Sequence, residues 1–61
     1  MNGREVIERL KAEGWAIDRI RGSHHVMMKE GCLVPVPVHG SRDIPAGTLA
    51  AIQRQTGVKL K

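Results

Sequence analysis

Residues 22–40, GSHHVMMKEGCLVPVPVHG, decide the fold of this chain. They contain two short turn sequences, Gly22-Ser23 and Glu30-Gly31. Each suits a tight hairpin, because glycine accepts the backbone angles that such turns need. The runs that lie between and after these turns are rich in valine and methionine. We therefore predict antiparallel strands over residues 24–29 and 32–38.

The flanking strands of this sheet are less regular. In the predicted third strand, Pro35 and Pro37 alternate with valines. Because proline has no amide hydrogen to donate to a ladder, this strand belongs at an edge of the sheet or is paired irregularly. Residues 15–21 form the predicted first strand, in which Ile17 and Ile20 differ in parity and interrupt the alternation. The central strand is then the first or the second.

Helices are predicted before and after the strands. Asn2 and Glu5 have the spacing of a capping box, in which each side chain bonds the backbone amide of the other residue. Pro45 suits the first turn of a second helix, and Gly57 suits its end. Apolar residues at helical spacing predict a core of Val6, Ile7, Leu10, Leu49 and Ile52, with Trp15, Met27 and Met28 packed against it.

These elements predict a single small α+β domain over residues 1–61, in the order α-β-β-β-α. Two helices would cover one face of a three-stranded antiparallel sheet, as in double-stranded-RNA-binding domains. A chain of this length buries only about 60% of the surface that it exposes when unfolded. We therefore expect no cofactor, and we expect any chemistry to come from a few side chains on an open surface.

The charge of the chain is basic and unevenly placed. Its 10 Lys and Arg residues outnumber its 6 Asp and Glu residues, for a formal charge of +4. Residues 1–13 are balanced, so the whole excess lies in residues 14–61. This pattern indicates a polyanion such as RNA as a partner, and it is as consistent with a basic surface that has no special role.

Several kinds of protein and site are disfavoured. One Trp and no Phe or Tyr leave no aromatic platform of the kind on which RNA-recognition sheets stack bases. The single Cys32 rules out an intrachain disulfide, and we interpret it as a small buried residue or one without a role. The histidines and Cys32 lack a closed zinc spacing, so we expect no metal. No apolar run approaches the ~20 residues of a membrane span, and we expect a cytoplasmic protein.

The histidines are the residues best suited to chemistry. Histidine titrates at about pH 6.5 and so can give or take a proton at neutral pH. RNA carries its own nucleophile, the 2′-hydroxyl, and its cleavage needs a base, an acid and positive charge on the phosphate. His24 and His25 follow the Gly22-Ser23 turn, flanked by Arg21 and Lys29. This arrangement suits a minimal ribonuclease site, although strand histidines without a role are the commoner case.

Adjacent strand histidines cannot share one role, because neighbouring residues point to opposite faces of a sheet. His24 shares its face with Met28, and His25 shares its face with Met27 and Lys29. Which face is open does not follow from the pattern, so the choice between His24 and His25 stays open at this point. The alternatives for function are a ribonuclease, an RNA-binding module without activity, and an adaptor that binds only protein.

Short motifs in a definite order relate the chain to a known family. They are Gly14-Trp15, Gly22-Ser23-His24-His25, Val36-Pro37-Val38-His39-Gly40, and Gly47-Thr48-Leu49 followed by Ile52. In order and spacing they resemble the HicA family of bacterial toxins, over nearly the whole chain. The resemblance implies a messenger-RNA interferase of double-stranded-RNA-binding-like fold, which a HicB antitoxin encoded beside it neutralises.

The resemblance also implies roles for individual residues. The catalytic histidine of the family lies in its Gly-Ser-His motif, which matches His24. We therefore expect a metal-independent endoribonuclease in which His24 gives or takes a proton and a cyclic phosphate is the first product. The expected phosphate-binding and pocket-shaping residues are Arg21, Gly22, Ser23, Lys29 and Arg42. No catalytic role for His39 follows from the motif that contains it.

Overall fold

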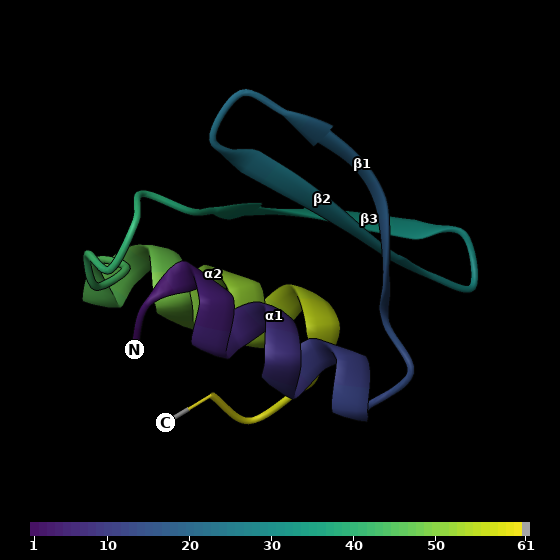
Figure 1. Cartoon of the computed structure of the whole chain (residues 1–61). Coiled ribbons are helices and arrows are strands. Elements are labelled where there is room, and N and C mark those ends of the chain that lie inside the picture. Colours follow the sequence, from purple (N-terminus) through teal and green to yellow (C-terminus); the bar gives the residue numbers. More distant parts are fainter. Residues whose placement is uncertain (61) are drawn as a thin grey trace.

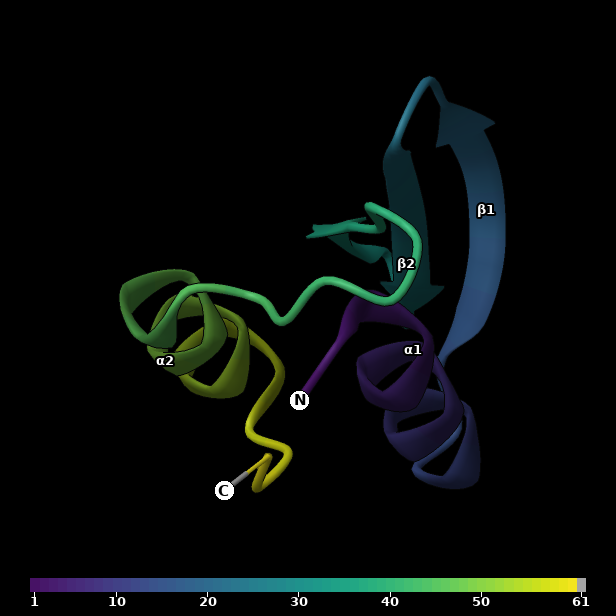
Figure 2. The ribbon, with the colours of Figure 1, turned by 60° about the vertical axis from the view of Figure 1, so that its left-hand side comes forward.

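Two helices lie beneath a three-stranded antiparallel sheet in the computed structural model, which describes residues 1–60 (Figure 1). The elements are α1 (Gly3–Ala12), β1 (Ala16–Arg21), β2 (His24–Lys29), β3 (Cys32–Pro37) and α2 (Ala46–Thr56). Both helices are on the same side of the sheet, which leaves its other face open (Figures 1 and 2). The predicted α+β class and element order are confirmed. No helix within residues 1–60 is long and apolar enough to cross a membrane.

The strand order is β1-β2-β3, so β3 lies at an edge, as its prolines predicted. The amide of Val38 donates to the carbonyl of Ser23 at 2.7 Å, which makes these residues a hydrogen-bonded pair of the ladder. Such pairs alternate with pairs that exchange no hydrogen bonds in antiparallel sheets. Pro37, which pairs with His24, and Pro35 are both in pairs that exchange no hydrogen bonds. Their missing amide hydrogens therefore face the free edge and cost the sheet no bond.

A bulge in β1 explains its broken alternation. The register of β1 against β2 shifts between Ile17 and Arg19. Ile17 pairs with Met27 and Ile20 pairs with His25, so the extra residue puts both isoleucines on the same face. The irregular spacing in the sequence is thus the signature of the bulge.

The register also decides which face of β2 is open. Met27 is fully buried against the helices, and the face that it shares with His25 and Lys29 is therefore the covered one. His24 and Met28 lie on the open face and are exposed. His25 is half-buried, and its Nδ1 is buried without a hydrogen-bond partner within residues 1–60. The exposed histidine of the adjacent pair is His24.

The core contains every helical residue that the spacing predicted. It also contains residues of β3 and of the segments just before and just after α2. Its buried members are Val6, Ile7, Leu10, Trp15, Met27, Val34, Val36, Ile44, Leu49, Ile52, Val58 and Leu60. One prediction about this core is wrong. Met28 is 39% exposed, because it follows Met27 and points to the open face. Cys32 is exposed at the start of the edge strand, which rules out the buried alternative and leaves the one without a role.

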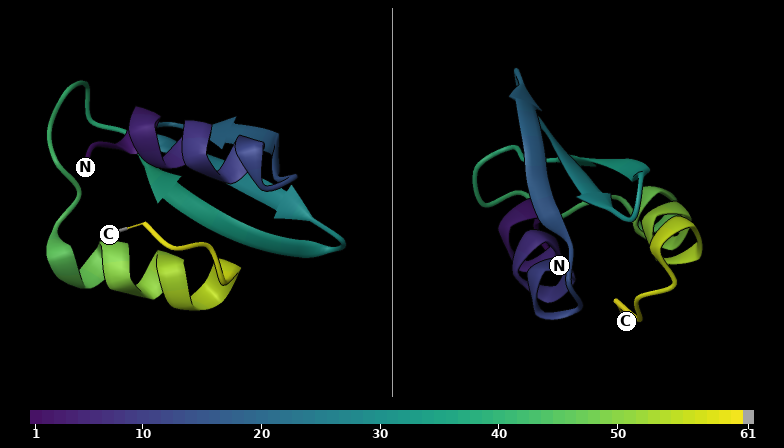
Figure 3. Two further views of the ribbon diagram at one scale, coloured as in Figure 1. Left: turned by 90° about the horizontal axis from the view of Figure 1, so that it is seen from below. Right: turned by 90° about the vertical axis from the view of Figure 1, so that its right-hand side faces the viewer.

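The chain after α2 closes the bottom of the core. Gly57 is the C-cap of α2, as predicted, and the chain then runs back between the helices (Figures 2 and 3). The amide of Leu60 donates to Gln53 Oε1 at 2.9 Å. Arg9 Nη1 donates to the carbonyl of Lys59 at 3.1 Å, which ties this tail to α1.

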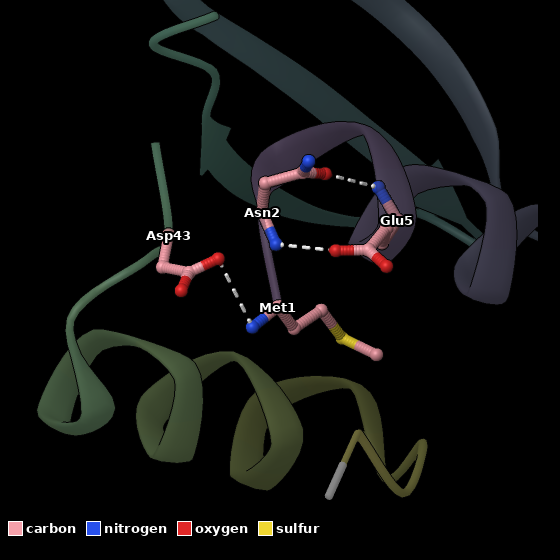
Figure 4. A network of polar contacts seen from close by, with 4 residues as sticks. All are labelled: Met1, Asn2, Glu5 and Asp43. Atoms are coloured by element: carbon pink, nitrogen blue, oxygen red, sulfur yellow. Dashed lines mark hydrogen bonds and ion pairs between the residues drawn. The ribbon is translucent and has the colours of Figure 1, made fainter. Parts of the chain in front are cut away.

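The start of α1 is fixed by its own cap and by the loop before α2 (Figure 4). The amide of Glu5 donates to Asn2 Oδ1 at 2.9 Å, and the amide of Asn2 donates to Glu5 Oε1 at 2.8 Å, so the predicted capping box is present. The Met1 amino group lies 3.4 Å from Asp43 Oδ1. The amide of Ile44 donates to the Met1 carbonyl at 2.9 Å.

Gly3 brings α1 into direct contact with the end of β3. A Cβ atom at this position would lie 2.5 Å from the carbonyl oxygen of Pro37 and 2.9 Å from the Cα of Val38. Both obstacles are backbone atoms, which cannot move aside as a flexible side chain could. The helix can approach this closely only because residue 3 has no side chain.

We expect Gly3→Ala to lower the free energy of unfolding by at least ~2 kcal/mol, because the new methyl group forces α1 away from β3. Gly47→Ala is the matched control, since nothing lies within 4 Å of its Cβ position. It should raise the free energy of unfolding by about 0.5 kcal/mol through better helix propensity. Urea unfolding followed by circular dichroism measures both. Equal effects of the two substitutions would contradict the contact at Gly3.

A second prediction concerns the β2–β3 turn, where Glu30 has a positive φ of 51° and Gly31 one of 82°. A left-handed backbone costs an ordinary L-residue roughly 1–2 kcal/mol, whereas Asn-Gly is the favoured pair for such a turn. Glu30→Asn should therefore raise the midpoint of urea unfolding, and Glu30→Val should lower it. Because both variants lose the same negative charge, equal midpoints for Glu30→Asn and Glu30→Val would contradict a cost of the left-handed backbone at this position.

Candidate functional site

A hollow of about 500 Å³ lies at the end of β3 that leads into α2. Open-face residues of β2 and β3, the following loop and the first turn of α2 line it. These residues are His24, Pro35, Pro37, His39, Arg42, Asp43, Ile44, Pro45 and Thr48. A volume of this size is within the range of sites for small molecules.

The turn between β1 and β2 places His24 at this hollow. Gly22 has a positive φ of 58° and Ser23 does not, the pattern of a hairpin turn with glycine in the first central position. Apart from its two neighbours in the chain, no residue within 1–60 has an atom within 4 Å of the Cβ position of Gly22, so the backbone of the turn is open to a ligand. Across the turn, Arg21 pairs with His24 and lies beside it on the open face.

The loop of residues 38–45 is fixed at both of its ends and in the middle. Val38 is bonded to Ser23 at its start, and Ile44 is bonded to Met1 at its end. Between them, the amide of Arg42 donates to the carbonyl of His39 at 3.1 Å and closes a turn. This turn holds His39 and Arg42 together at the wall of the hollow.

The hollow is basic on balance. Arg42 lines it, and Arg21 lies beside His24. Its one carboxylate within residues 1–60, Asp43, faces the Met1 amino group. The first turn of α2 also borders the hollow, and no side chain within residues 1–60 caps it, so the positive end of the helix dipole adds to the field. The arrangement favours an anion.

The described residues provide no metal centre. Within residues 1–60, no group of three or more His, Cys, Asp or Glu side chains is placed to hold a metal ion. The functional groups that line the hollow within residues 1–60 are two imidazoles, a guanidinium group, the Asp43 carboxylate and the Thr48 hydroxyl.

Comparison with known families identifies the chain. A family model described as the HicA toxin of bacterial toxin–antitoxin matches residues 3–58. The chain belongs to the HicA toxin family. The match confirms the family that the sequence motifs indicated, and it spans both helices and all three strands. No curated protein matches the chain.

The structure of this HicA family member brings most of the predicted site residues together. His24 and Arg42 line the same hollow, although they are far apart in the sequence. Arg21 lies next to His24, and Gly22 and Ser23 form the turn that positions it.

Lys29, one of the expected phosphate-binding residues, is the exception, because it lies outside the residues that line the hollow. It is at the opposite end of β2, roughly 16 Å along the strand from His24. Its parity directs it to the covered side, where Nζ donates to the carbonyl of Glu13 at 2.7 Å. A cation in this position stabilises the carboxyl end of α1. In this HicA protein, Lys29 therefore stabilises the packing of β2 against α1 and lies outside the lining of the hollow.

Three polar residues of the hollow, His39, Asp43 and Thr48, were given no role from the sequence. The signal for His39 was available in the hairpin register. Since Pro37 pairs with His24, residue 39 falls on the same face, opposite the turn. Thr48 is in the first turn of α2, and only the tertiary arrangement brings it to β3.

Proposed function

We propose that this chain is the toxin of a type II toxin–antitoxin system, a metal-independent endoribonuclease that cleaves messenger RNA in the cytoplasm. The observation that carries the proposal is the position of His24. It is exposed on the open face of the sheet, in a basic hollow with Arg42 and beside Arg21. A group that can move a proton and groups that can hold a phosphate are thus within reach of one bound strand.

The proposed reaction uses the 2′-hydroxyl of RNA as nucleophile. His24 exchanges a proton with the attacking or the leaving oxygen, while Arg21 and Arg42 hold the phosphate and offset its developing charge. The bond from O2′ to phosphorus forms as the bond from phosphorus to O5′ breaks. The products are a 2′,3′-cyclic phosphate and a 5′-hydroxyl. No metal is needed, because the RNA supplies the nucleophile.

The turn before His24 completes the proposed phosphate site. The open space around Gly22 lets a phosphate approach the backbone closely. Half-buried Ser23 can donate its hydroxyl to a phosphate oxygen. RNA would therefore lie across the turn and the hollow, with its backbone against the Arg21 side.

We further propose that a HicB-type antitoxin neutralises the protein by covering this region. The open face of the sheet carries exposed apolar side chains, Met28 at 39% and Leu33 at 52%, on the same strands as the hollow. A partner that packs on them and presents acidic groups to Arg42 would bury His24 and compete with phosphate. Binding would also stabilise a small core, because a ligand of the folded state shifts the unfolding equilibrium.

Replacing His24 tests the ribonuclease proposal. His24→Ala should lower the rate of RNA cleavage in EDTA by about 10²–10⁴-fold, the usual contribution of a positioned acid or base. Because His24 is exposed, the melting temperature of the His24→Ala protein should match that of the parent. Cleavage at the parent rate would remove His24 from the mechanism. If the parent protein bound RNA and cleaved none, the chain would instead be a non-catalytic RNA-binding module.

The salt dependence of RNA binding tests where phosphate is held. Each phosphate contact on a single strand contributes about 0.7 to the slope of log K against log salt concentration. Arg42→Ala should lower this slope by about that amount, measured with a 2′-O-methyl RNA that cannot be cleaved. Lys29→Ala removes the same charge away from the hollow and should leave the slope unchanged. A larger loss for Lys29→Ala would place the RNA on the other end of β2.

A further inference from the structure

We propose that His39 is a second catalytic residue, which completes an acid–base pair with His24. The inference rests on the proposed ribonuclease function and adds to it the group that transfers the other proton. Cleavage by the 2′-hydroxyl needs one group to accept a proton and one to donate a proton. A single histidine can do only one of these in a given step.

The ladder between β2 and β3 places His39 near His24. β3 ends at Pro37, but the 2.7 Å bond from the Val38 amide to the Ser23 carbonyl continues the pairing for one more residue. In this register His39 falls opposite Gly22, one diagonal step from His24 on the same face. Diagonal neighbours in an antiparallel ladder are about 7–8 Å apart, with their Cβ atoms somewhat closer, a separation that two imidazole side chains can span around one phosphate group.

The composition of the hollow singles out His39 as the second group. Of the side chains that line it within residues 1–60, only those of His24, His39 and Asp43 are of the types that act as general acids or bases. Asp43 faces the Met1 amino group at 3.4 Å and is tied to the start of α1. His39 is exposed, and the turn that ends at Arg42 holds its backbone in place. The charged groups around the pair are Arg21, Arg42 and Asp43.

The proposed step balances without any further reactant. One imidazole takes the proton of the 2′-hydroxyl as O2′ bonds to phosphorus. The other, protonated at the start, gives its proton to O5′ as the bond from phosphorus to O5′ breaks. The phosphate becomes the 2′,3′-cyclic diester, and the two histidines finish with exchanged protonation states. The total number of protons on the pair is unchanged.

The test compares His39→Gln with Ser41→Ala, a change in the same exposed loop at a residue outside those that line the hollow. His39→Gln should lower kcat by about 10²–10⁴-fold while its affinity for 2′-O-methyl RNA stays within twofold of the parent. Ser41→Ala should retain the parent kcat. The parent should show a bell-shaped pH–rate profile, and His39→Gln and His24→Gln should each lose a different limb.

A substrate with sulfur in place of the bridging O5′ identifies the acid, since a thiolate leaves without a proton. One of the two histidine variants should regain most of its rate on this substrate, and the other should not. If His39→Gln kept the parent kcat and both limbs of the pH–rate profile, the proposed histidine pair would be wrong and the ribonuclease function would stand. A fall in kcat with both limbs of the profile retained would also contradict the pair. If the parent cleaved no RNA in EDTA, the proposed function itself would fail, and the pair with it.

Discussion

The contact between Gly3 and the end of β3 is the constraint on which the site depends. The backbone of α1 lies against Pro37 and Val38 with no space for a side chain. This contact fixes the point where the chain leaves the sheet and enters the loop of residues 38–45. Because His39 and Arg42 are in that loop, the packing of α1 sets their distance from His24. A helix that contributes no side chain to the hollow thus determines its shape.

The two faces of strand β2 have different roles in the domain. On the covered face, Met27 fills the core and Lys29 bonds the end of α1. On the open face, His24 meets the hollow. Alternation alone makes this separation possible in so small a protein, because the same strand provides both a buried core residue and an exposed histidine. His25 is on the covered side and therefore cannot substitute for His24, although it is the next residue in the chain.

Local signals predicted much of this fold and part of the site. The capping box at Asn2 and the hairpin turns depend on neighbouring residues, and the prolines of β3 depend only on the chemistry of proline. The burial of Leu60 and the placement of Lys29 were not predictable in this way, because they depend on contacts between elements distant in sequence. The assignment of His24 needed the family motif, since parity without a known covered face is ambiguous. The placement of His39 near His24 required the register of the strands, which the positions of the turns already implied.

The prolines of β3 affect how any partner can reach the site. The residues of β3 that face the free edge are Leu33, Pro35 and Pro37, of which only Leu33 has an amide hydrogen to donate. An added strand would find almost no donors there, so this edge resists pairing with another chain. A partner that covers the hollow must therefore bind through side chains on the open face or through β1, whose six residues are all exposed. The same prolines line the hollow. Their fixed φ angles limit movement of its wall, so His24 and the loop of residues 38–45 present a largely preformed surface to any ligand.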